Sequence, residues 1–81
     1  MAKPSPTYAG AKELVALGKV IRELRLEFDY SQEAFADAVG IDRSYVGGIE
    51  RGEHNLALMN PLKISKTLNL SVSQLLTKAK L

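Results

Sequence analysis

Residues 31–52 read SQEAFADAVGIDRSYVGGIERG, and this stretch decides the fold. It predicts two short helices joined by a tight turn at residues 39–42, a break short enough for the helices to pack directly against each other at a steep angle. The second helix, over about residues 43–50, is unusual for a core helix. It opens with polar side chains and carries Gly47 and Gly48 where a buried helix would carry bulk. We therefore expect this helix to lie close against another molecule.

The composition allows one small domain. The chain has 81 residues, of which 46% are hydrophobic and only 6% are aromatic, a balance that favours packed aliphatic helices over a sheet. Without cysteine, neither disulfides nor a cysteine zinc site can hold the fold together. No segment approaches the roughly 20 apolar residues of a membrane span, and the N-terminus has no secretory signal. We therefore expect a cytoplasmic protein.

The residues before this stretch predict one amphipathic helix over about residues 11–29. Gly18 costs this helix about 1 kcal/mol of propensity relative to alanine, which indicates close packing against a neighbour. Residues 1–10 contain two prolines among small and polar side chains, so they predict a flexible N-terminal arm ahead of a domain over residues 11–81. The apolar positions of the helix are Leu14, Leu17, Ile21, Leu24 and Phe28.

Capping residues mark where the later helices begin and end. Ser31 and Asp42 are suitable N-caps, and Gly40 suits the left-handed conformation that ends a helix. A fourth helix starts either at Leu58 or at Pro61, since proline is tolerated in the first turn of a helix.

The last two predicted helices complete an all-α fold of five helices. Ser71 and Gln74 form a capping box, in which each side chain satisfies a backbone N–H of the other residue. This box begins a fifth helix that continues through Leu75. The apolar positions of the fourth helix are Leu58, Leu62, Ile64 and Leu68.

Catalytic and metal-binding classes find no support in the sequence. His54 is the only histidine, and no recognisable nucleophile motif accompanies it. Metal sites need clustered ligands, which one histidine without cysteine does not supply. Gly47 and Gly48 lack the spacing and the preceding strand of a phosphate-binding loop. We expect no enzyme, no cofactor and no metal site.

Nucleic-acid binding is the better interpretation of residues 43–50. A net charge of +2 and a pI near 9.0 permit it. Arg43, at the start of the helix, can form two parallel hydrogen bonds to a guanine, and Ser44 can serve a base or a phosphate; a solvated surface arginine is the alternative for Arg43. Tyr45 either covers the edge of the core or reaches a phosphate. The Gly47–Gly48 pair either reflects drift or admits thymine methyls and sugar edges.

At this point the sequence resembles a known family. SQEAFADAVGIDRSYVGGIERGEHN is similar to the helix-turn-helix of the lambda-repressor-like (Xre-type) family, which includes the small controller proteins of restriction–modification systems. LGKVIRELR and LKISKTLNLSVSQLL match that family's first, fourth and fifth helices, so the resemblance covers about residues 14–76. RSYVGGIERG is most similar to the controllers. The resemblance implies a sequence-specific DNA-binding transcriptional regulator.

The family pattern also implies roles for individual residues. Arg43, Ser44 and Gly48 match positions that face the bases. Arg25 and Glu50 match a partly buried ion pair that ties the first helix to the third. Gln32 matches a glutamine that anchors a phosphate and braces the recognition helix. The full set of residues expected at the DNA backbone is Gln32, Tyr45, Arg51, His54, Asn55 and Asn60.

One such domain contacts a short half-site, so we expect a homodimer on a near-palindromic operator. In relatives the dimer surface lies on the fourth and fifth helices, and RNA polymerase is a further candidate partner. The alternative function is a protein-interaction or antitoxin module that uses the same fold to dock on a protein. The candidate dimer residues, each with ordinary core packing as its alternative, are Leu56, Met59, Leu70 and Leu75.

Overall fold

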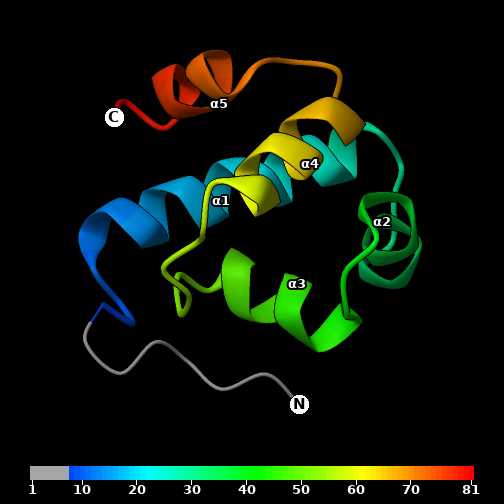
Figure 1. The fold of residues 1–81 in the computed structure, drawn as a ribbon, viewed down its shortest axis with the longest axis horizontal. Coiled ribbons are helices and arrows are strands. Elements are labelled where there is room, and N and C mark those ends of the chain that lie inside the picture. Colours follow the sequence, from blue (N-terminus) through cyan, green and yellow to red (C-terminus); the bar gives the residue numbers. More distant parts are fainter. Residues whose placement is uncertain (1–7) are drawn as a thin grey trace.

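The fold consists of five helices and no strand within residues 8–81, the part of the chain that the computed structural model describes. In chain order these are α1 (Lys12–Glu27), α2 (Gln32–Val39), α3 (Arg43–Glu50), α4 (Met59–Thr67) and α5 (Val72–Lys78). Helix α1 crosses the molecule, with α5 on one side of it and α3 on the other (Figure 1). The predicted all-α fold of five helices is confirmed.

The N-terminal arm expected over residues 1–10 lies largely outside the described residues, which begin at Tyr8. Residues 8–10 form a turn, and the Gly10 N–H donates a hydrogen bond of 2.8 Å to the Gly52 carbonyl. The described chain therefore starts against the loop that follows α3.

The predicted caps are present at the helix ends. The Ser31 hydroxyl accepts a hydrogen bond of 3.0 Å from the Ala34 N–H at the start of α2, and Gly40 ends that helix in the left-handed conformation with φ of 88°. Before α5, the Ser71 hydroxyl accepts from the Gln74 N–H, and the Gln74 side chain accepts from the Ser71 N–H. Each cap satisfies a backbone donor that the helix itself leaves unpaired.

Helix α4 begins near the earlier of its two predicted starts. Leu58 occupies the N-cap position, and the Leu62 N–H donates to the Leu58 carbonyl at 3.1 Å. Pro61 thus sits in the first turn, where its missing N–H has no helical acceptor to lose.

The core gathers residues from all five helices. Its fully buried side chains include Phe35, Ile21, Ile64, Leu68, Leu75 and Val46. Three predicted apolar positions are exposed: Phe28 follows the last residue of α1, Leu58 precedes α4, and Leu62 lies near the α4 start. Their exposed fractions are 45%, 67% and 42% for Phe28, Leu58 and Leu62.

Gly18 allows α1 and α3 to approach each other closely. A Cβ atom added to Gly18 would clash with the Ile49 carbonyl oxygen and would lie only 2.9 Å from the Glu50 carbonyl carbon. Both neighbours are backbone atoms and cannot swing aside. The close packing expected from Gly18 is confirmed, and it fixes the depth at which α3 sits on α1.

A buried ion pair joins the same two helices. Arg25 Nε donates to Glu50 Oε2 at 2.6 Å, Arg25 Nη2 donates to Glu50 Oε1 at 3.2 Å, and the two side chains are only 7% and 3% exposed. Arg25 Nη1 also donates to the Tyr30 carbonyl at 2.8 Å, in the turn between α1 and α2. One arginine therefore links α1, the next turn and the end of α3.

None of the helices within residues 8–81 combines the length and the apolar character needed to cross a membrane.

We expect Gly18→Ala to destabilise the protein by about 1–3 kcal/mol, because the added methyl group overpacks the α1–α3 contact. If only helix propensity mattered, Gly18→Ala would instead stabilise the protein by about 1 kcal/mol. Urea unfolding followed by circular dichroism measures the difference. Lys19→Ala, at an exposed position of the same helix, is the control and should change stability by no more than about 0.5 kcal/mol. A Gly18→Ala variant that is more stable than wild type would contradict the close approach.

Removing one partner of the buried pair should cost far more than removing both. We expect Glu50→Ala to reduce the free energy of unfolding by about 3–5 kcal/mol, because it leaves the buried Arg25 guanidinium without a carboxylate. Arg25→Met combined with Glu50→Leu should recover most of that loss, since apolar side chains can fill the same space. Equal losses in the single and double variants, measured by urea unfolding, would rule out this explanation.

Candidate nucleic-acid interface

Helix α3 presents its N-terminal end to solvent and buries its middle. Val46 and Ile49 are 1% and 4% exposed and hold the helix to the core. Arg43, the first helical residue, is exposed, and Ser44 is half-buried. The helix packs on α1 and α2 through its apolar side, so the end that carries Arg43 is left accessible.

Asp42 caps α3 and engages Ser44. Its carboxylate accepts a hydrogen bond of 3.0 Å from the Ser44 N–H and a second one from the Ser44 hydroxyl. These two bonds, the hydroxyl one above all, hold the pKa of Asp42 below its usual range. The Ser44 hydroxyl therefore donates its proton to the Asp42 carboxylate.

Gln32 braces the end of α3, the structural half of its expected role. Its Nε2 group donates to Glu50 Oε1 at 3.0 Å, which adds α2 to the Arg25–Glu50 pair. The carboxylate of Glu50 thus receives hydrogen bonds from both α1 and α2. The ion pair that the family pattern implied is present, and Gln32 extends it.

Gly47 lies beneath the side chain of Arg51. A Cβ atom at Gly47 would lie 3.1 Å from Arg51 Nη1, so the guanidinium rests against the bare helix backbone. Arg51 also forms a surface ion pair with Glu53, with 2.7 Å between Nε and Oε2 and 3.2 Å between Nη2 and Oε1. The hydrogen bonds of this pair raise the pKa of Arg51 and lower the pKa of Glu53.

Glu53 was missed by the sequence reasoning. Gly52 separates it from Arg51 and adopts a φ of 75°, a left-handed conformation that turns the chain back on itself. An arginine and a glutamate flanking such a glycine were the available signal for the ion pair.

Gly48 and His54, both predicted at the DNA, are buried against each other. Gly48 is buried, and a Cβ atom there would clash with the ring of His54, lying 2.7 Å from its Cδ2 atom. His54 is only 5% exposed, and its Nε2 atom has no hydrogen-bond partner within the described residues. The loop after α3 folds the imidazole onto the helix, so the space beside Gly48 is filled by the ring of His54.

Tyr45 packs next to His54. Its ring lies 4.5 Å from that of His54, centroid to centroid, and it is half-buried against the core. The Asn60 side chain donates to the Tyr45 hydroxyl at 3.1 Å, which links the start of α4 to α3. Tyr45 covers the edge of the core, the first of its two interpretations.

The predicted DNA-facing residues that remain accessible gather around the two ends of α3 and the loop behind it. Arg43, Arg51 and Asn55 are exposed, while Gln32, Ser44, Tyr45 and Asn60 are half-buried.

The four candidate dimer residues differ clearly in how exposed they are. Met59 is 62% exposed, whereas Leu56 and Leu70 are half-buried against the core. Leu75 is fully buried, so core packing, its alternative role, holds for this residue. Helix α5 packs on α1 and α4, and Leu75 lies in the core that these helices share.

Comparison with known proteins identifies the fold and the family. A family described as Helix-turn-helix matches residues 21–75. Control protein C.MunI from Mycoplasma sp is 40% identical over 75% of this chain and 84% of its own length, and control protein C.SmaI from Serratia marcescens is 39% identical over 83% and 77%. The crystal structure of the restriction–modification controller protein C.AhdI from Aeromonas hydrophila matches with a TM-score of 0.74 and 46% identity, over 78% of this chain and 96% of that one. This chain therefore belongs to the helix-turn-helix family of DNA-binding transcriptional regulators and is similar to restriction–modification controller proteins.

Proposed function

We propose that this regulator binds a near-palindromic operator as a homodimer, with the N-terminal end of α3 in the major groove. The observation that supports this is the division of α3 into a buried middle and an exposed start that carries Arg43. An arginine there can donate two parallel hydrogen bonds to a guanine. Similarity to C.MunI, C.SmaI and C.AhdI makes the control of a restriction–modification system the proposed biological role.

The proposed DNA contacts are assigned to the residues of this face whose side chains are accessible. Arg43 and Ser44 read bases, while Arg51 and Asn55 meet phosphates behind the recognition helix. Half-buried Gln32, Tyr45 and Asn60 can add backbone contacts through the edges that they expose. The proposed contacts leave out Gly48 and His54, because both are buried.

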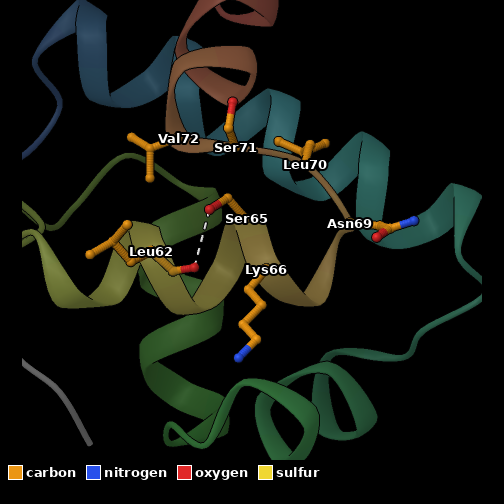
Figure 2. Close-up of a pocket in the computed structure, with 7 residues that line it drawn as sticks. All are labelled: Leu62, Ser65, Lys66, Asn69, Leu70, Ser71 and Val72. Carbon is orange, nitrogen blue, oxygen red and sulfur yellow. Dashed lines mark hydrogen bonds between the residues drawn. The ribbon is translucent and has the colours of Figure 1, made fainter.

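The start of α4 supports a dimer surface. Leu58, Met59 and Leu62 are 67%, 62% and 42% exposed, and together they form an apolar strip at the start of α4. Figure 2 shows the neighbouring groove, where Leu62 and Ser65 on α4 lie opposite Ser71 and Val72 at the start of α5. Apolar side chains exposed in this way suit contact with a second copy, since the unpaired strip would otherwise meet water.

Base reading by Arg43 is tested with the operator, once it has been selected from random duplex DNA. We expect Arg43→Ala to weaken operator binding by about 5- to 150-fold, the value of about 1–3 kcal/mol for one bidentate base contact. Binding to a scrambled duplex should change far less. For the wild type, the logarithm of the affinity should fall steeply with the logarithm of salt concentration, as measured by fluorescence anisotropy.

Lys78→Ala is the matched control, because it removes one cation from α5, on the far side of α1 from α3 (Figure 1). Equal losses on operator and scrambled DNA after Arg43→Ala would overturn the base-reading role. Absence of salt-dependent DNA binding, together with tight capture of a protein partner, would favour the interaction-module alternative.

The dimer surface is tested at Met59. We expect Met59→Glu to weaken self-association by about tenfold or more, because dimerisation would bury an unpaired carboxylate. Sedimentation equilibrium measures the dissociation constant. Leu26→Glu is the control, since Leu26 is 47% exposed on α1, outside the proposed surface. If both variants dimerise equally well, the start of α4 is not the contact.

A further inference from the structure

In the Arg51–Glu53 ion pair, Glu53 contacts only one edge of the guanidinium group. Glu53 engages the Nε and Nη2 groups of Arg51, at 2.7 and 3.2 Å. The hydrogens on Nη1 take no part in that pair and remain able to donate to a phosphate or to a base. Glu53 therefore holds the guanidinium from one edge and leaves the opposite edge available.

Gly47 supplies the surface on which that guanidinium lies. A Cβ atom at Gly47 would come within 3.1 Å of Nη1 and 3.9 Å of Cζ, so a side chain there would push the arginine away from the helix. The same position lies 3.9 Å from Nε2 of Gln32, which is itself fixed by Glu50. Glycine at this point lets Arg51 lie against α3 between Glu53 and Gln32.

Stability is a weak explanation for the pair. The Arg51 and Glu53 side chains are 62% and 30% exposed, and surface ion pairs contribute little to folding. Because hydrogen bonds from Arg51 lower the pKa of Glu53, its carboxylate is charged at neutral pH. A negative charge on the proposed DNA face repels phosphates, so its presence there calls for a role in binding.

We infer that Glu53 is a positioning residue that makes Arg51 discriminate between operator and non-specific DNA. The inference rests on the proposed function. Held over Gly47, Arg51 can use its Nη1 edge only when the duplex is docked in one register, the register that Arg43 sets on the operator. On other sequences, phosphates that are not aligned with Nη1 cannot use Arg51, because Glu53 holds its Nε and Nη2 groups. Glu53 thus lowers non-specific affinity more than operator affinity.

The charge is tested with Glu53→Gln, using the selected operator and a scrambled duplex of equal length. We expect affinity for the scrambled duplex to rise about two- to fivefold, with a smaller change on the operator, so the affinity ratio falls. The salt dependence on scrambled DNA should steepen by about one unit of slope, because Arg51 becomes available to any phosphate. Glu27→Gln on α1 removes the same charge beside α5 and should leave the ratio unchanged.

The positioning is tested with Gly47→Ala, which leaves all charges in place. Only the mobile end of Arg51 lies within 3.4 Å of the added methyl group, so this variant is expected to fold. We expect operator affinity to fall about two- to tenfold, the value of one hydrogen bond, with little change on scrambled DNA. If the ratio of operator affinity to scrambled-duplex affinity does not change, the positioning role is overturned. Glu53 would then only repel phosphates through its charge.

An Arg51→Ala background provides the decisive comparison. If Glu53 acts through Arg51, Glu53→Gln should no longer alter the affinity ratio in that background. A change of the same size with and without Arg51 would overturn the inference. Wild type that binds DNA without preferring its operator would instead overturn the proposed function, so the two failures are distinguishable. NMR of the Arg51 Nε–H group, with and without Glu53→Gln, reports the contact in the absence of DNA, and an unchanged signal would also count against it.

Discussion

The position of α3 depends on one buried carboxylate. Glu50, at the end of that helix, accepts hydrogen bonds from Arg25 on α1 and from Gln32 on α2, so three helices converge on one group. A buried ion pair of this kind often adds no net stability over an apolar replacement, whereas losing one partner is costly. We interpret its value here as orientation. Fork-like hydrogen bonds permit few arrangements, and these determine where the exposed end with Arg43 points.

Glycines contribute as much to the packing of α3 as the larger side chains do. At Gly18 the absence of a Cβ atom lets the carbonyls of α3 approach α1. At Gly47 and Gly48 it makes room for Arg51 and His54, which return from the loop to cover the helix. Helix α3 is therefore covered by residues that follow it in the chain, and part of its outer surface belongs to the loop.

Different parts of the domain carry different features. Apolar burial and the Glu50 network hold α3, its two ends and the following loop offer cations and polar groups, and the start of α4 exposes an apolar strip. The structural match to C.AhdI covers 78% of this chain and 96% of that one. Glu53 introduces an acidic group among the proposed DNA contacts, and its contact with Arg51 follows from the turn at Gly52.

The sequence by itself determined the helix-turn-helix and most helix ends, because caps such as Ser31 and the left-handed Gly40 act over a few residues. It also indicated the close contact at Gly18 and, through family resemblance, the Arg25–Glu50 pair. Only the tertiary structure decided that His54 is buried on Gly48 and that Leu75 belongs to the core. The physical reason is that periodicity tells which face of a helix is apolar, whereas the neighbour that covers each position depends on how the loops return the chain. The ion pair of Arg51 with Glu53 likewise forms only because Gly52 turns the backbone.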